Sequence, residues 1–332
     1  MQQRQLSDGR VDLQVSQLCL GTMNFGYRTD QPTSFAILDR FAEAGGTFLD
    51  TANNYGQWHG DAGESERVIG RWRRSRGVTD EVVVATKVGA RTLLPGDPSP
   101  AHWQGLGAKT IREDAETSLR QLGVDRLDLY YAHIDDRATP LEETVDALAQ
   151  LAEDGTVGLL GASNHATWRI ERARAIARAS GRPAYSCVQQ EHSYLLAQPD
   201  PGQLNLVTDE LIDYAAAEGL TLLAYSPLLK GVYARPGQAP PGRLRPSRQP
   251  GADGGPARGG GRAGRDPDPG GARLAHGWPA VDDPGRRRQR RGPARRAARR
   301  RRPAPGRRRP QAPGPGRPPR RRLGRGRGRR SW

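Results

Sequence analysis

Short apolar segments alternate with amphipathic segments between residues 17 and 226 of this 332-residue chain. The first kind is typical of buried strands, and the second of helices that pack on them. Strands separated in this way predict a parallel sheet, because parallel neighbours need a crossover connection. The predicted strands are 17–20, 47–50, 82–87, 127–132, 157–163, 187–191 and 221–226, and the predicted helices are 32–44, 65–74, 109–122, 141–153, 167–179 and 208–218.

One motif separates the two parallel-sheet architectures that fit this alternation. A doubly wound sheet that binds a dinucleotide is expected to carry Gly-x-Gly-x-x-Gly after an early strand. The first strand here runs into Gly21-Thr-Met-Asn-Phe-Gly26, which lacks that spacing. The sequence therefore favours an α/β fold of the (β/α)8 TIM-barrel type. Since seven strand segments are found, the barrel is predicted to lack strand eight and the last helices.

The composition changes abruptly near residue 242. Residues 243–332 hold 29 Arg and 5 Asp with no Lys or Glu, whereas the preceding residues hold 23 basic and 31 acidic side chains. This C-terminal region also lacks Ile, Phe, Tyr and Met, so it cannot bury enough apolar surface to offset chain entropy. We predict a truncated barrel over residues 1–241 and a disordered tail rich in Arg, Gly and Pro over residues 242–332.

One constant shift of the reading frame would explain this tail. With suitable codons for residues 243–255, the shifted frame reads Ala-Tyr-Asp-His-Pro-Gly-Asn-Arg-Ala-Arg-Met-Ala. The same shift over residues 278–289 can yield Gly-Pro-Pro-Ser-Met-Ile-Pro-Val-Val-Gly-Ala, which is suited to an eighth strand. The hypothesis is that the chain from about Gly242 onward is translated out of frame.

The net charge of +16 would ordinarily indicate binding to nucleic acid. The arginines lie in the tail without interleaved aromatic residues, so no specific nucleic-acid partner is expected. No apolar stretch is long enough to span a bilayer, and the first residues form no apolar signal region. Cys19 and Cys187 cannot make a disulfide framework and both lie in strand-like segments, which fits buried thiols in a reducing compartment. A cytoplasmic protein without a membrane partner is expected.

Polar side chains stand where three predicted strands end. Asp50, Lys87 and His133 lie at or just past these ends, and Tyr55 follows Asp50 closely. The carboxyl ends of parallel strands meet on one face of a barrel, where active sites are built. Because a buried polar group is costly unless it is paired, the four residues predict one shared polar site.

These four side chains are suited to giving a proton to an oxygen atom. A phenol with a pKa near ~10 is a poor acid at neutral pH. An ammonium group favours the phenolate, so Lys87 is expected to lower the pKa of Tyr55 and make it a usable proton donor. Asp50 can hold Lys87 charged, and His133 can position a carbonyl group. No metal site is predicted, because it would need further His or carboxylate ligands beside His133, and His59, His102, His165 and His192 are not expected there.

The chain resembles the aldo-keto reductase family over residues 17–236, roughly two thirds of its length. Each matching segment is a weak motif, but their order and their positions at strand ends make the set specific. The segments are Leu20-Gly-Thr-Met-Asn-Phe-Gly26, Phe48-Leu-Asp-Thr-Ala-Asn-Asn-Tyr-Gly56, Ala85-Thr-Lys87, Asp128-Leu-Tyr-Tyr-Ala-His133, Gly161-Ala-Ser-Asn164, Val188-Gln-Gln-Glu191 and Ala224-Tyr-Ser-Pro-Leu228.

The resemblance implies a barrel that binds a nicotinamide cofactor, usually NADPH, without a dinucleotide-binding domain. Tyr55 would be the general acid, supported by the other three residues. The family's contacts to the adenosine 2′-phosphate follow strand eight, and no matching segment exists here, so NADH is possible as well. The cofactor residues that the resemblance implies are Ser163, Asn164 and Gln189 around the nicotinamide amide, Tyr225 stacked on its ring and Ser226 facing the pyrophosphate.

The implied function is an NAD(P)H-dependent oxidoreductase that reduces an aldehyde or a ketone, a small carbonyl substrate, to an alcohol. Two alternatives stay open: an inactive subunit of the same fold that senses cofactor redox state or binds a partner, and a non-functional product of the frame shift. The intact set of four polar residues favours an enzyme. The sequence defines neither the particular substrate nor the oligomeric state.

Overall fold

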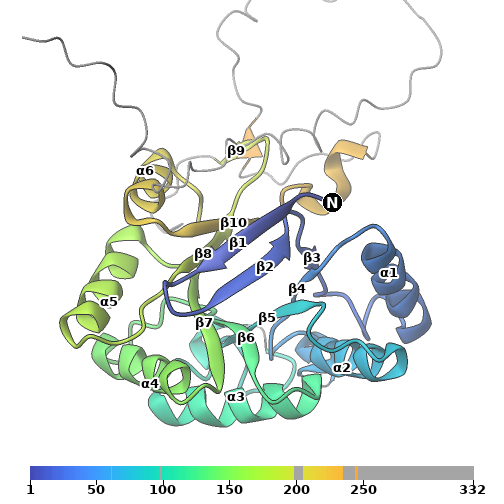
Figure 1. Cartoon of the computed structure of the whole chain (residues 1–332), viewed down its shortest axis with the longest axis horizontal. Helices are drawn as coiled ribbons and strands as arrows, with labels where there is room; N and C mark the ends of the chain where they lie inside the picture. Colours follow the sequence, from blue (N-terminus) through green and yellow to red (C-terminus); the bar gives the residue numbers. More distant parts are fainter. Residues whose placement is uncertain (61, 98, 198–204, 235–243, 246–332) are drawn as a thin grey trace, which may run out of the picture. The chain divides into compact units, whose positions relative to one another are not determined.

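A curled parallel sheet forms the centre of the computed structural model of this chain, with helices on its outer face (Figure 1). Its seven strands run in the order β10-β8-β7-β6-β5-β4-β3, and every neighbouring pair is parallel. The structure describes residues 1–60, 62–97, 99–197, 205–234 and 244–245. The strands are β3 (Leu20–Gly21), β4 (Phe48–Asp50), β5 (Val83–Val88), β6 (Leu127–Ala132), β7 (Val157–Ser163), β8 (Cys187–Glu191) and β10 (Thr221–Tyr225).

The predicted alternation of strands and helices is confirmed, and the fold is an incomplete (β/α)8 barrel. An eighth parallel strand is not among the residues that the structure describes, so β3 and β10 form the two edges of the described sheet. Each helix begins within one residue of its predicted start. The helices are α1 (Gln31–Glu43), α2 (Glu64–Arg76), α3 (Ala108–Leu122), α4 (Leu141–Glu153), α5 (Thr167–Ala179) and α6 (Asp209–Glu218).

The ends of α6 show why the boundaries of these helices can be predicted from sequence. The Thr208 hydroxyl oxygen accepts from the backbone N–H of Leu211 and so satisfies one free donor of the first turn. Gly219 ends the helix in the left-handed conformation, with φ at 66°, which glycine adopts without steric cost. Local side-chain chemistry thus fixes both boundaries.

An N-terminal hairpin, absent from the predictions, closes the amino end of the barrel. Strands β1 (Gln3–Ser7) and β2 (Asp12–Ser16) pair antiparallel, and their apolar side chains pack against the barrel interior. Ser16 and Thr47, the residue before β4, exchange two hydrogen bonds of 2.8 and 3.0 Å between backbone N–H groups and hydroxyls. The predicted first strand at 17–20 is wrong in position, because Gln17 bonds to the backbone of Gln2 in the hairpin.

Apolar side chains pack in two layers, one inside the barrel and one between the sheet and the helices. The inner layer includes Tyr131 and Cys187, both without exposed surface. Gly161 of β7 leaves room for this tyrosine, since a Cβ atom there would lie 2.4 Å from its ring. Burial raises the pKa of Cys187 to about 12, so the predicted buried thiol is confirmed there, whereas Cys19 is partly exposed.

The predicted disordered tail over residues 242–332 lies outside the described residues, apart from Leu244–Arg245. These two residues form strand β11, which pairs antiparallel with β9 (Leu196–Ala197). In the part of the chain that the structure describes, no helix is long and apolar enough to cross a membrane.

Candidate active site

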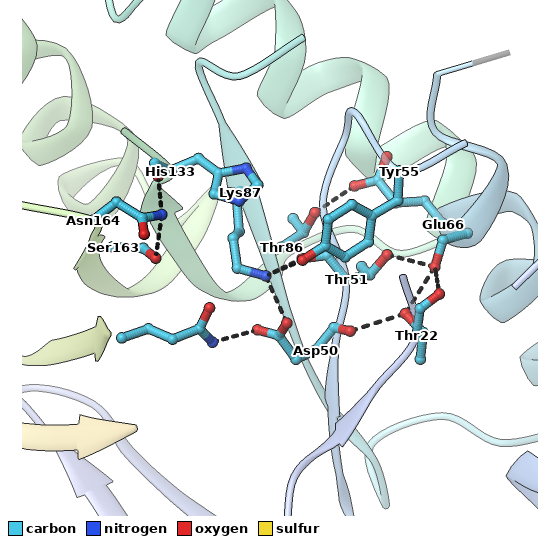
Figure 2. A network of polar contacts seen from close by, with 12 residues as sticks. Thr22, Asp50, Thr51, Tyr55, Glu66, Thr86, Lys87, His133, Ser163 and Asn164 are labelled. Carbon is cyan, nitrogen blue, oxygen red and sulfur yellow. Dashed lines mark hydrogen bonds and ion pairs between the residues drawn. The ribbon is translucent and has the colours of Figure 1, made fainter. Parts of the chain in front are cut away.

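The four polar residues singled out in the sequence lie together at the carboxyl ends of neighbouring strands (Figure 2). Asp50 ends β4, Lys87 lies one residue before the end of β5, and His133 directly follows β6. Tyr55 lies on the loop between β4 and α2. Because β4, β5 and β6 are adjacent in the sheet, their side chains meet on one face of the barrel.

Lys87 is the centre of this site and has no exposed surface. Its Nζ donates to Asp50 Oδ2 at 2.6 Å, to the backbone carbonyl of Thr51 at 2.7 Å and to the Tyr55 hydroxyl at 3.3 Å. An ammonium group has three N–H donors, so all of them are used. A buried charge is tolerated when it is paired and hydrogen-bonded, and both conditions hold here.

Burial and neighbouring charges set the protonation states of this group. Burial lowers the pKa of Lys87, but the Asp50 carboxylate and the Tyr55 phenol outweigh it, and the pKa lies above its ordinary value. Burial is the largest influence on the pKa of Tyr55 and raises it, the Asp50 carboxylate raises it further, and Lys87 lowers it, so the net direction is upward. The prediction of a lowered phenol pKa is therefore wrong for this arrangement, because desolvation dominates. The phenol keeps its proton at neutral pH.

His133 lies beside the phenol and is uncharged. Its ring centroid is 6.1 Å from that of Tyr55, with the two rings edge to face. Burial, followed by the charge of Lys87, holds the pKa of His133 well below its ordinary value. The Nδ1 atom is buried and bonds to no residue that the structure describes. A neutral imidazole has one donor nitrogen and one acceptor nitrogen.

Asn164 joins the end of β7 to this group and holds a left-handed backbone conformation, with φ at 61°. Its Nδ2 donates to the His133 carbonyl at 2.8 Å and to the Ser163 hydroxyl at 3.1 Å. Its Oδ1 accepts from the Tyr225 hydroxyl at 2.8 Å, and Asn205 donates to the same tyrosine oxygen at 2.6 Å. Three of the expected cofactor residues thus lie together next to His133.

Gln189 on β8 bonds directly to Asp50. Its Nε2 donates to Asp50 Oδ1 at 2.7 Å, while Lys87 occupies the other carboxylate oxygen. Ser226 lies one residue past β10 with an exposed side chain and φ at 56°. Lys87 and Gln189 thus bond to Asp50, whereas Ser163, Asn164 and Tyr225 lie next to His133. Ser226 is the one expected site residue with an exposed side chain at the sheet edge.

The loop that carries Tyr55 is anchored by residues for which no binding role is expected. Asn53 Nδ2 donates to Asp114 Oδ2 at 2.6 Å, and Arg91 Nη2 donates to the other oxygen at 2.9 Å. Asn54 Nδ2 donates to the carbonyl of Ala90 at 3.3 Å. Through these contacts both asparagines fix the shape of the loop.

The side chains that the structure describes do not indicate a metal site. Among the described residues, no three His, Cys, Asp or Glu side chains are grouped closely enough to hold an ion. The Lys87 ammonium instead supplies the positive charge at the strand ends.

Fold and site together define a class of protein: parallel α/β barrels with a buried lysine that binds a carboxylate and a tyrosine at the carboxyl ends of the strands. The sequence model of the aldo/keto reductase family matches residues 17–252, so the chain belongs to this family. The resemblance proposed from sequence is thereby confirmed, and the match runs past residue 236, where it was expected to end.

Several proteins are similar to this chain. The Bacillus subtilis oxidoreductase YrpG is 39% identical over 225 residues, which cover 68% of this chain and 66% of that protein. The norsolorinic acid reductase stcV of Emericella nidulans is 36% identical over 229 residues, 67% of this chain and 56% of its own. An aryl-alcohol dehydrogenase of Pestalotiopsis microspora is 31% identical over 245 residues, 71% and 60% of the two chains. The chain thus spans about half to two thirds of the length of these relatives.

Proposed function

We propose that this protein is an NAD(P)H-dependent reductase that converts an aldehyde or a ketone to an alcohol. The observation that carries the proposal is the saturated Lys87 ammonium, which binds Asp50, Thr51 and a protonated Tyr55 at the carboxyl ends of the strands. Family membership and relatives named as oxidoreductases support the reaction class. The substrate would be a small carbonyl compound, and the expected location is the cytoplasm.

The proposed chemistry assigns the proton to Tyr55. Its hydroxyl gives the proton to the carbonyl oxygen of the substrate, and Lys87 stabilises the phenolate that remains. Asp50 keeps the ammonium charged and in place. His133 is neutral, so it can donate one N–H to the same carbonyl oxygen and orient it. When bound, the nicotinamide cofactor supplies the hydride.

The residues on β7, β8 and β10 fit the amide and ring of a nicotinamide. Gln189 uses its Nε2 on Asp50, and its Oε1 accepts no hydrogen bond from the described residues, which leaves an acceptor for an amide N–H. Ser163 and Asn164 present further polar groups beside it. Tyr225 presents an aromatic ring at the end of β10. We expect NADPH to bind here, with Ser226 towards the pyrophosphate, and NADH to be a possible substitute.

The reductase is proposed for a chain with a complete barrel. We further propose that residues 1–241 form the reductase barrel and that residues 242–332, as written, are an out-of-frame tail. A chain that truly carried this tail would leave strands one and seven of the barrel with unpaired edges. An inactive redox-sensing or binding subunit is the second candidate, and it would bind the cofactor without turnover.

The test uses full-length protein produced from resequenced coding DNA. Oxidation of NADPH and of NADH is followed by absorbance with a panel of aldehydes and ketones, and Tyr55→Phe serves as the matched inactive control. Turnover that depends on both a carbonyl compound and Tyr55 is expected. Cofactor binding without turnover of any carbonyl compound would reject the reductase and favour the binding subunit.

A further inference from the structure

Three hydroxyl side chains lie behind the catalytic group and have no exposed surface: Thr22, Thr51 and Ser65. They come from three elements, since Thr22 follows β3, Thr51 follows β4 and Ser65 lies in the first turn of α2. Figure 2 shows both threonines next to Asp50. We call these three residues the hydroxyl cluster.

Ser65 is the hub of the hydroxyl cluster. Thr51 Oγ1 donates to Ser65 Oγ at 2.9 Å, and Ser65 Oγ donates to the Thr22 carbonyl at 2.9 Å. The Thr22 hydroxyl lies 2.7 Å from Ser65 Oγ and 2.9 Å from the Asp50 carbonyl, to which it can donate. A serine hydroxyl has one donor and two acceptor lone pairs. Ser65 uses its donor on the Thr22 carbonyl and one lone pair on the Thr51 hydroxyl, while the Thr22 hydroxyl, whose proton goes to the Asp50 carbonyl, lies in close contact with Ser65 Oγ.

The hydroxyl cluster holds the same backbone that binds Lys87. The Asp50 carbonyl accepts from both the N–H and the hydroxyl of Thr22. The Thr51 N–H donates to the Ala85 carbonyl at 2.9 Å, while its own carbonyl accepts from Lys87. The first turn of α2 and the residue after β3 are therefore hydrogen-bonded to Asp50 and Thr51. These two residues supply two of the three acceptors of the Lys87 ammonium.

We infer that Ser65, through Thr22 and Thr51, positions the Asp50 carboxylate and the Thr51 carbonyl on Lys87, and thereby aligns the ammonium with the Tyr55 oxygen. The three hydroxyl groups bond to one another and to backbone carbonyls rather than to the phenol, so they act as positioning residues. This inference deepens the proposed function and rests on it for its effect on turnover. The alignment itself can be measured without any substrate.

The consequence is a change in the acidity of Tyr55. The Lys87 ammonium lowers the pKa of the phenol, against the larger effect of burial. If the two acceptors shift, the ammonium moves away from the phenol oxygen and its lowering effect shrinks. Loss of the cluster is thus expected to make Tyr55 a weaker acid by ~10-fold, one pKa unit, which is within the range that nearby charges produce.

The experiment places difluorotyrosine at position 55 of the full-length protein. Fluorine lowers the intrinsic phenol pKa into a range that a folded protein tolerates, and fluorine NMR reports this residue alone. The variants are Ser65→Ala and Thr51→Val, with Thr51→Ser as the rescue that keeps the hydroxyl. Ser34→Ala is the matched control, because Ser34 is equally buried near the start of α1 and bonds to the Asp30 carbonyl.

The expected result is a higher pKa at position 55 in Ser65→Ala and Thr51→Val, and an unchanged pKa in Thr51→Ser and Ser34→Ala. In active protein the same two variants should lower kcat with little change in KM or in NADPH binding. An unchanged pKa in both, with only a lower unfolding temperature, would overturn the inference and leave a structural role. If Ser65→Ala does not fold, Thr51→Val decides alone. A shifted pKa in protein that turns over no carbonyl compound would reject the reductase and keep the positioning role.

Discussion

The proposed catalytic half of the site, on β4 to β6, and the proposed cofactor half, on β7 to β10, are built differently. Every residue of β5 is buried, and the Lys87 ammonium donates three hydrogen bonds. Strand β10 is half-buried along most of its length, with Ala224 exposed, and β8 is its one neighbour in the described sheet. The catalytic geometry is therefore preformed in the middle of the sheet, whereas Tyr225 and Ser226 lie at an edge.

Two residues connect the halves. Asn164 bonds to both His133 and Tyr225, and Gln189 bonds to Asp50. Cofactor binding at these amides would consequently be coupled to the charged group around Lys87. If the proposed roles hold, proton donation would depend on buried contacts, and cofactor affinity would depend on what completes the sheet beside β10.

The largest expected effect comes from completing the sheet beside β10. If residues from about Gly242 are out of frame, a corrected frame should add an eighth strand between β10 and β3 and change a chain that is inactive or aggregated into an active reductase. Resequencing the coding DNA around codons 236–245 and measuring the mass of the natural protein test this directly. An unaltered frame, together with activity in protein of the printed sequence, would refute the frame hypothesis.

The next largest effect is expected from Tyr55→Phe, which changes the proposed catalytic half alone. In an active full-length protein, Tyr55→Phe should lower kcat by roughly 10² to 10⁴-fold, because general acid catalysis by a positioned side chain contributes on that scale. NADPH affinity, measured by fluorescence titration, should change little, since the aromatic ring is kept and only the hydroxyl group is lost. A variant that retains most of the wild-type kcat would remove Tyr55 as the general acid.

Lys87→Met tests how far the catalytic half depends on charge. The substitution leaves the buried Asp50 carboxylate without its counter-ion, which typically costs about 3–5 kcal/mol of unfolding free energy. It also removes the contribution that lowers the pKa of Tyr55, so any remaining activity should be low. The double variant with Asp50→Asn is the control, and urea unfolding should show it to be more stable than Lys87→Met. Equal stability of the two would argue against the charge explanation.

Tyr225→Ala probes the cofactor half. Loss of the ring should weaken NADPH binding by roughly 10-fold, in line with ~1 kcal/mol for an aromatic contact, and slow hydride transfer at saturation much less. Tyr225→Phe keeps the ring and loses the hydroxyl that donates to Asn164, so its effect should be smaller. If both variants bound NADPH and NADH like the wild type, Tyr225 would not lie in the cofactor site.

The parts of the site also differ in how far they can be predicted from the sequence. Strand ends place Asp50, Lys87 and His133 on one face, because polar residues closing apolar strands are visible as a pattern. The Thr51 carbonyl and Ser65 leave no such signal, since a backbone acceptor and a common serine gain meaning only through tertiary register. The direction of the Tyr55 pKa was also out of reach, because the desolvation that decides it depends on packing from several elements.

The smallest expected effect compares two histidines, one from each half. Burial and Lys87 hold the pKa of His133 well below its ordinary value, and burial lowers the pKa of His192 near β8 as well. Unfolding frees each ring to bind a proton near pH ~6.5, so the unfolded state binds more protons below that pH. The free energy of unfolding should consequently be highest above about pH 6.5 and fall as the pH drops towards the folded pKa values.

Urea unfolding between neutral and acidic pH measures this fall in unfolding free energy. The substitution His133→Asn should reduce the fall more than His192→Asn does. An equal reduction in the two variants would mean that the buried catalytic half is no more sensitive to protonation than the sheet edge.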